Sequence, residues 1–175
     1  MISTLGDLGD FIGGIAVVIT LIYLAIQVRQ NTSALKAASW QEVVSGARQA
    51  ARLRGDPDVA PAWAKGLSHY PDMPAEDMST FSMAVTDEAL FFQGVYALHQ
   101  SGQLDDSVYE AYLQWFAAII NTPGGSAWWT LIGKPIFVPK MVETVSQRLA
   151  QGGLPDIQTL PGVGAADWQP EIQAQ

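Results

Sequence analysis

The stretch FIGGIAVVITLIYLAIQV, from Phe11 to Val28, decides the fold of this chain. It carries no charge, and its only polar side chains are those of Thr20, Tyr23 and Gln27. An α-helix rises about 1.5 Å per residue, and about 20 apolar residues cross a hydrocarbon core about 30 Å thick. A helix packed on a water-soluble protein would show a polar face, and this one shows almost none. The sequence predicts a transmembrane helix over residues 11–28, preceded by a segment over residues 1–10.

The distribution of basic residues predicts the orientation of this helix. Residues 1–10 contain no Lys or Arg, whereas Arg29 and Lys36 follow the span closely. The positive-inside rule then places the N-terminus outside and the following domain in the cytoplasm, with the span in the inner (cytoplasmic) membrane. A basic segment before the apolar run and a small-residue cleavage site are both missing, so we expect a retained anchor rather than a cleaved signal peptide.

Small and polar residues of the span recur at steps of three and four, which places them on one helix face. Small residues on such a face let a second helix approach closely, and an amide can hydrogen-bond across the contact. We predict a packing face in the membrane; the alternative is that these residues are ordinary components of a membrane helix. The face consists of Gly9, Gly13, Ala16, Thr20, Tyr23 and Gln27.

Beyond the span the sequence is rich in helix formers, and no β-period is visible. Residues 29–54 are expected to form a helical stalk that continues the span, although Asn31-Thr32-Ser33 offers a break or a new cap. Gly55-Asp56-Pro57 should end it, because Pro cannot continue a helix. Residues 55–150 then form an acidic helical domain. The predicted fold class is all-α.

Within this domain, turn residues divide the sequence into segments with helical periodicity. Ser101-Gly102 closes a long helix over residues 75–100, and Ser107 with Glu110 has the spacing of a capping box for a helix from about Asp106 to Asn121. The short turn between them predicts an antiparallel hairpin. The remaining expected helices cover residues 58–67, a short one capped by Ser126 after a Pro123-Gly124-Gly125 turn, and residues 139–150.

The last segment, residues 151–175, combines Gly and Pro with several large apolar side chains. Its Gly and Pro content rules out a regular helix. We predict a tail that is either disordered or laid along a surface, that of its own domain or that of a partner. Candidate partner contacts are Trp128, Trp129, Leu160 and Trp168, although core packing is the alternative for the tryptophan pair.

Composition excludes several classes of function. Residues 66–133 contain eight acidic residues and no Lys or Arg, and the whole chain has a formal charge of −8. Nucleic acid is therefore not expected as a partner, because phosphate binding needs clustered basic residues. The absence of cysteine excludes disulfides and thiolate chemistry.

One carboxylate stands out as a candidate for chemistry. Glu88 shares a face of the long predicted helix with Phe81, Val85 and Phe92, and His99 lies on the same face near its end. Desolvation among apolar side chains raises the pKa of a carboxyl group, which is how general acids are made. The alternatives are that Glu88 lies at the edge of the core and that His99 complements the helix dipole.

Other site patterns are incomplete. Neither His69 nor His99 follows a Glu by three residues, as a di-iron bundle site requires. Asp105, Asp106 and Glu110 are explained by helix capping rather than by calcium binding, and no Lys follows the glycines at 124–125 as in a P-loop. The sequence gives no argument for a catalytic residue, a metal or a cofactor beyond Glu88.

Two blocks carry a resemblance. The segment VVITLIYLAIQVRQNTSALKAASWQ (residues 17–41), and the later blocks GQLDDSVYEAYLQWF and TPGGSAWWTLIGKPIFVPKMVETV, resemble a widespread bacterial family of uncharacterised single-span membrane proteins. This resemblance implies architecture and no activity. Members of that family often carry a Glu-Asn pair in the long helix, where this chain has Gln93-Gly94. A role that depends on that carboxylate is not expected here.

These observations favour a non-catalytic, membrane-anchored accessory or scaffolding subunit of a larger membrane assembly. Its expected partners are the lipid bilayer and other membrane subunits. One alternative is a membrane-tethered sensor or enzyme with a site between helices near Glu88. Another is a homo-oligomer formed through the face of the span.

Overall fold

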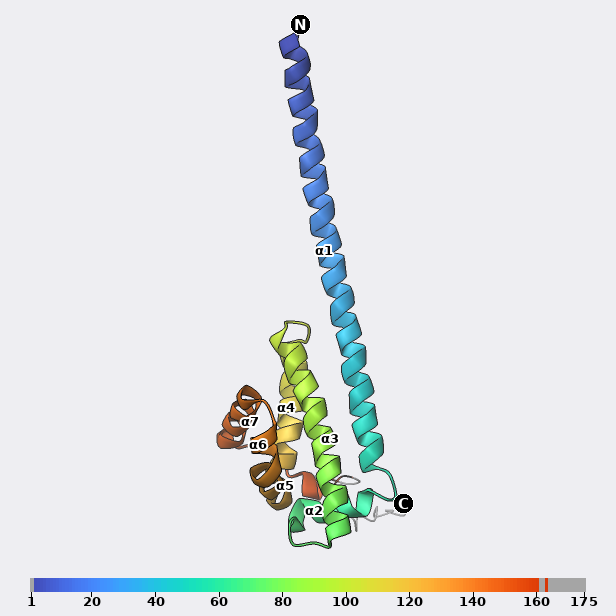
Figure 1. Ribbon diagram of the computed structural model, residues 1–175, viewed down its shortest axis with the longest axis vertical. Coiled ribbons are helices and arrows are strands. Elements are labelled where there is room, and N and C mark those ends of the chain that lie inside the picture. Colours follow the sequence, from blue (N-terminus) through green and yellow to red (C-terminus); the bar gives the residue numbers. More distant parts are fainter. Residues whose placement is uncertain (1, 161–162, 164–175) are drawn as a thin grey trace, which may run out of the picture. The chain divides into compact units, whose positions relative to one another are not determined.

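The computed structural model describes residues 2–160 and residue 163, with the backbone alone for residues 2–12. The described chain is helical throughout and contains no strand (Figure 1). It divides into two compact units, Met1–Trp40 and Gln41–Gln175. The predicted all-α class, with a long apolar N-terminal helix followed by a helical domain, is confirmed.

The first unit is the leading part of one helix, α1 (Ile2–Arg54). Helix α1 passes through Asn31-Thr32-Ser33 without a break, because the Thr32 hydroxyl donates to the Val28 carbonyl oxygen at 3.0 Å and so does not act as a cap. Every side chain from Gly13 to Ala38 is exposed. This is a helix long and apolar enough to cross a membrane. The helix ends at Arg54, before the predicted Gly-Asp-Pro stop.

The second unit packs the end of α1 with six further α-helices and two short helices of other types. They are α2 (Ala60–His69), α3 (Ala75–Gln100), α4 (Asp106–Ile120), α5 (Pro123–Trp128), the π-helix η1 (Trp129–Gly133), α6 (Lys134–Ile136), α7 (Pro139–Gln151) and the 3₁₀-helix η2 (Ile157–Thr159). Helices α3 and α4 lie side by side as the predicted hairpin (Figure 1). Gly102, with a φ of 71°, reverses the chain after α3, a conformation that glycine adopts without strain.

The core of this unit is aromatic. Phe92 of α3 and Phe116 of α4 stack with ring centroids 5.0 Å apart, and Trp129 meets Phe116 edge-on at 5.7 Å. Trp128 and Trp129 are both buried. Aromatic pairs in these geometries contribute about 0.5–1.5 kcal/mol beyond the area they bury. The face of α3 predicted from its periodicity is confirmed, since Phe81, Val85, Glu88, Phe92 and Val95 are all buried.

The structure corrects two predicted helix caps, although α4 starts at Asp106 as expected. Asp105 is the N-cap of α4 and makes no side-chain capping bond, so the Ser107–Glu110 capping box does not form. The Pro-Gly-Gly stretch is not a turn before a Ser126 cap but the first turn of α5. Its N-cap is Thr122, whose hydroxyl accepts from the Gly125 amide at 3.0 Å. Pro123 suits the first helical position, where its missing N–H is not needed.

A glycine contact joins α5 to α2. A β-carbon at Gly124 would overlap the carbonyl oxygen of Gly66, and one at Gly66 would overlap the ring of Phe81. The missing side chain at Gly124 therefore lets the backbones of α5 and α2 approach, and the missing side chain at Gly66 makes room for the Phe81 ring of α3. This explains why α5 must begin on glycines.

The described part of the tail lies along its own domain. Ile157 of η2 is fully buried, and the Trp63 indole N–H donates to the Val163 carbonyl oxygen at 3.0 Å. The side-chain amide of Gln158 also donates to the Ser68 hydroxyl. Of the two predicted states, packing on a surface is the one seen for residues 154–160 and 163, and the surface is that of α2 and its neighbours.

Candidate functional site

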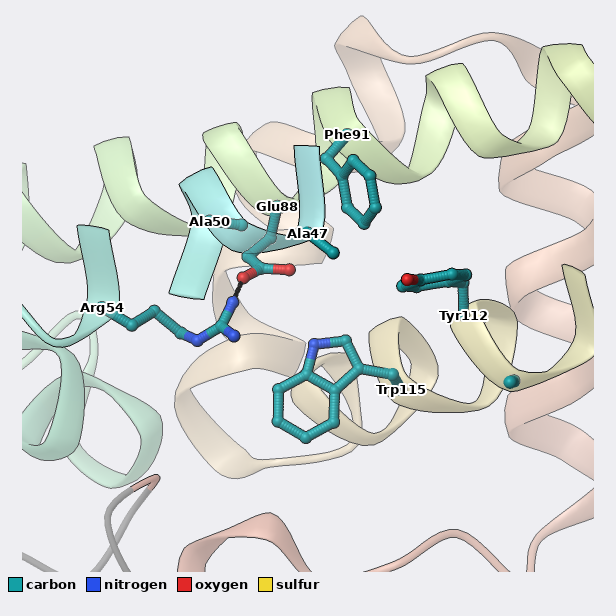
Figure 2. Close-up of a pocket in the computed structure, with 8 residues that line it drawn as sticks. Ala47, Ala50, Arg54, Glu88, Phe91, Tyr112 and Trp115 are labelled. Atoms are coloured by element: carbon teal, nitrogen blue, oxygen red, sulfur yellow. Dashed lines mark ion pairs between the residues drawn. The ribbon is translucent and has the colours of Figure 1, made fainter. Parts of the chain in front are cut away.

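A pocket of about 200 Å³ opens in the second unit among residues of α1, α3 and α4. Figure 2 shows its arrangement, with Arg54 and Glu88 at one end and three aromatic rings along the space beside them. Small side chains on α1 leave this space unfilled. The lining residues are Ala47, Ala50, Arg54, Glu88, Phe91, Ala111, Tyr112 and Trp115.

Glu88 and Arg54 form an ion pair at the base of this pocket (Figure 2). The side chain of Glu88 is 3% exposed and that of Arg54 is 18% exposed. Removing one partner of a buried pair leaves an uncompensated charge, which costs several kcal/mol, of the order of 3–5. The prediction that Glu88 lies among apolar side chains is confirmed, and the predicted alternative of an edge position is wrong.

Aromatic rings surround the guanidinium of Arg54. It lies 5.8 Å from the centroid of the Trp63 ring and 5.3 Å from that of Trp115, within the range of cation–π attraction. Burial lowers the pKa of Arg54 below its ordinary value, and the charge of Asp87 acts in the opposite direction. Arginine remains protonated in proteins at neutral pH, so Arg54 is a fixed positive charge.

The far wall is formed by Phe91 and Tyr112, whose rings meet edge-on with centroids 5.3 Å apart. Burial raises the pKa of the Tyr112 phenol, so this side chain is neutral at pH 7. A β-carbon at Gly46 would lie 2.7 Å from the Phe91 ring. The ring can therefore pack against α1 only because residue 46 has no side chain. Helix α4 turns Leu113 and Phe116 to the core, while Tyr112 and Trp115 remain half-buried.

This geometry limits what Glu88 can do chemically. A carboxylate held by a guanidinium is stabilised in its charged form, which is the opposite of what a general acid at neutral pH requires. Its other oxygen faces the space bounded by Phe91, Tyr112 and Trp115 (Figure 2). The geometry of the site therefore favours binding of a ligand over transfer of a proton by Glu88.

Arg54 is the residue that sequence reasoning missed. It lies in the predicted stalk, at the end of a different helix from Glu88. The available signal was indirect: a buried carboxylate requires a counter-charge, and residues 66–133 supply none. Nothing in the periodicity of either helix indicates that Arg54 at the end of α1 meets Glu88 in the middle of α3.

No family model matches this chain, and no curated protein or solved structure matches it at a significant level. The resemblance to a bacterial single-span family stays a prediction.

His99 lies outside the pocket and has a structural explanation. Its ring stacks on Tyr109 with centroids 3.9 Å apart and an interplanar angle of 5°. Its Nε2 lies 2.9 Å from Oδ1 of Asp106, at the start of the next helix. His99 therefore joins the two ends of the α3–α4 turn. In the part of the chain that the structure describes, no group of three His, Asp or Glu side chains is placed to hold a metal ion.

The predicted membrane face is exposed wherever its side chains are described. Gly13, Ala16, Tyr23 and Gln27 are open, and no other residue lies within 4 Å of a β-carbon built at Gly13. The Thr20 hydroxyl donates to the Ala16 carbonyl oxygen at 2.8 Å, so its hydrogen is used within its own helix. The exposure of Gly9 is outside the part of the chain for which side chains and burial are described.

The structure separates the predicted partner contacts into three groups. Trp128 and Trp129 are at most 2% exposed, so they are core residues and cannot contact a partner on the surface of this domain. Trp129 stacks on Phe137 and meets Phe116 edge-on, and Trp128 stacks on Trp129. Leu160 is 37% exposed and remains available, whereas Trp168 lies outside the described residues.

Proposed function

We propose that this chain is a single-pass membrane anchor carrying a helical domain, and that it acts as a non-catalytic accessory or scaffolding subunit of a membrane assembly. The observation that carries the proposal is the exposure of every side chain between Gly13 and Val28. Leaving large apolar side chains in water forgoes about 1.5–3 kcal/mol for each one that burial would gain. A lipid bilayer or a partner helix removes that cost.

The finer assignment places the span in the inner membrane, the N-terminus outside and the domain in the cytoplasm. Its support is the Arg29 and Lys36 side chains directly after the span, together with the absence of basic residues before it. The acidity of residues 66–133 argues against nucleic acid as a partner on that side.

Anchoring and orientation are tested together. Membranes from expressing cells are washed with alkaline carbonate, and intact cells and inverted vesicles are each treated with protease. We expect the full chain to stay in the membrane pellet, and residues 75–150 to be cleaved only in inverted vesicles. Release by carbonate would contradict the anchor, and digestion in intact cells would contradict the orientation.

The role as a subunit requires a separate experiment. The chain is extracted in a mild detergent and its mass and composition are compared with those of two variants. Gly13→Ile enlarges the small-residue face, whereas Ile15→Leu changes volume little and lies off that face. We expect a complex with other chains in fixed stoichiometry that Gly13→Ile weakens and Ile15→Leu preserves.

Two other results would favour the alternatives. A complex that contains only copies of this chain would support the homo-oligomer. A monomer in mild detergent, for both the natural chain and the variants, would remove the argument for a packing face and leave a tethered sensor as the better description.

A further inference from the structure

We infer that the pocket between α1, α3 and α4 binds a small primary ammonium compound with an apolar body, the ammonium group on Glu88 and the body against the rings of Phe91, Tyr112 and Trp115. This inference concerns a ligand of the domain and does not rest on the proposed subunit role. Four features of the pocket carry it: its size, its walls, its charge and the state of the carboxylate.

The size of the pocket selects a small ligand. An apolar cavity of about 150 Å³ holds benzene, so one of about 200 Å³ holds a ring with one or two further heavy atoms. Many ligand pockets are larger, about 300–1,000 Å³. A nucleotide, a sugar phosphate or a peptide segment is excluded by volume.

The walls select an apolar body next to a cation. Phe91, Tyr112 and Trp115 contribute three aromatic rings, and Ala47, Ala50 and Ala111 contribute methyl groups. The faces of aromatic rings carry negative potential, which attracts cations and is of no benefit to an anion. The neutral Tyr112 phenol adds a hydroxyl group that can accept or donate a hydrogen bond.

The charge of the site selects a cation over an anion. Arg54 supplies one positive charge, whereas Glu88 and the nearby Asp87 supply two negative charges. The walls from α3 and α4 belong to residues 66–133, which have eight acidic residues and no Lys or Arg, whereas α1 also carries the exposed Arg48 and Arg52. An anion would have to compete with Glu88 for the Arg54 guanidinium, whereas a cation meets the Glu88 oxygen that Arg54 does not contact (Figure 2).

The state of the Glu88 carboxylate identifies the contact atom. One of its oxygens meets the Arg54 guanidinium, and the other faces the pocket (Figure 2). A carboxylate has about four lone-pair positions, so one ion pair leaves acceptor capacity unused. An ammonium group bound here would donate a hydrogen bond to that oxygen.

The test compares three probes of nearly equal size by isothermal titration into the full chain in lipid nanodiscs, with empty nanodiscs as the blank. Benzylamine is cationic at pH 7, benzyl alcohol is neutral and benzoate is anionic. For a ligand of this size we expect a Kd on the order of 1 mM for benzylamine, and binding at least about tenfold weaker for the other two.

Two variants that replace an alanine by leucine test whether benzylamine binds in this pocket. Ala111→Leu places a larger side chain at the pocket from an exposed position of α4, so the ion pair and the core are left intact. Ala97→Leu makes the same change at an exposed position of α3 that does not line the pocket. Benzylamine binding should be lost in the first and unchanged in the second.

Four results would overturn the inference. The first is the absence of saturable benzylamine binding at concentrations well above the expected Kd, and the second is retention of benzylamine binding in Ala111→Leu. The third is equal affinity for benzyl alcohol, which would indicate a purely apolar cavity. The fourth is tighter binding of benzoate, which would make Arg54 the residue that binds the charged group. Circular dichroism of each variant confirms that its helices are intact before titration.

Discussion

Residues 13–28 of α1 and helix α3 are both apolar around most of their circumference, yet their side chains meet opposite environments. In α3, one face buries Phe81, Val85 and Phe92 against other helices. In residues 13–28, every side chain is exposed. The apolar character of a helix therefore does not by itself identify its solvent. The difference lies in the charges: α3 carries four acidic residues, one of them paired at the centre of the domain, whereas the span has none.

The buried charge on α3 gives the largest expected effect. Glu88→Ala removes one partner of the ion pair and leaves Arg54 uncompensated, so the free energy of unfolding of the domain should fall by about 3–5 kcal/mol. Urea unfolding of the full chain in nanodiscs, followed by tryptophan fluorescence, measures it.

The matched control for this variant removes both charges. Arg54→Met combined with Glu88→Leu should recover most of the loss, because replacement of a buried pair by apolar residues is often close to neutral. A loss below about 1 kcal/mol in Glu88→Ala would mean that the pair is solvated, since surface pairs contribute about 0–1 kcal/mol.

A charge placed on each helix tests the difference in solvent directly. Ile19 of the span is 61% exposed and Leu90 of α3 is 55% exposed, so the two positions are nearly equal by exposure. Ile19→Arg should disfavour membrane insertion by about 2.5–3.5 kcal/mol. Leu90→Arg should change the stability of the domain by no more than about 0.5 kcal/mol.

Membrane retention after carbonate washing, quantified by immunoblot, reads out the first variant, and urea unfolding reads out the second. If Ile19→Arg is retained as well as the natural chain, the environment of residues 13–28 is not lipid. A large loss in Leu90→Arg would show that the exposed side of α3 is covered by another chain.

Alanine substitutions at two glycines of the domain should change its stability by smaller amounts and in opposite directions. Gly124→Ala introduces a β-carbon that overlaps the Gly66 carbonyl oxygen, and it should cost about 1–3 kcal/mol through displaced backbone. Gly94→Ala, in the exposed interior of α3 with nothing within 4 Å, should instead stabilise the domain by about 0.5–1 kcal/mol. Thermal unfolding of the two variants should shift in opposite directions, and shifts of the same sign would contradict the backbone contact between α5 and α2.

The smallest expected change in the free energy of unfolding occurs at alkaline pH. Burial raises the pKa of Tyr109 and Tyr112 above the ordinary value of 10.0. Below that pH both phenols are neutral in the folded and unfolded chains, so their contribution to stability is complete. As the pH rises further, the unfolded chain loses protons first and the folded state is progressively destabilised. Urea titrations at about pH 9 and about pH 11 should show a loss that Tyr112→Phe reduces, and an unchanged loss would place its origin in other groups.

The sequence predicted those parts of the fold that local patterns determine. Helix α3 begins and ends at the predicted residues, because Pro74 precedes it and Ser101-Gly102 follows it. The burial of Glu88 was readable from its apolar neighbours at steps of three and four. The start of α5 was not readable, because Pro-Gly-Gly is typical of a turn and becomes helical here only through the Thr122 cap and the contact with Gly66.

Long-range partners were beyond sequence reasoning. The pairing of Arg54 with Glu88 joins two helix positions with no shared period, and the hydrogen bond from Trp63 to the carbonyl oxygen of Val163 spans a sequence separation of 100. Composition left the tail either disordered or laid along a surface, and the described part, residues 154–160 and 163, lies along a surface. It could not indicate that the surface belongs to the same chain.

The burial of Ile157 has a consequence for the order of events during synthesis. Ile157 is the last buried core residue in the described part of the chain, and it follows Val28 by about 130 residues. At about 5–20 residues per second, the ribosome makes the span roughly 6–26 seconds before it makes the last core residue. Under the proposed anchoring, the apolar helix is inserted while the domain still lacks a full core. We expect the domain to complete its folding as a tethered chain, with its start already fixed at the membrane.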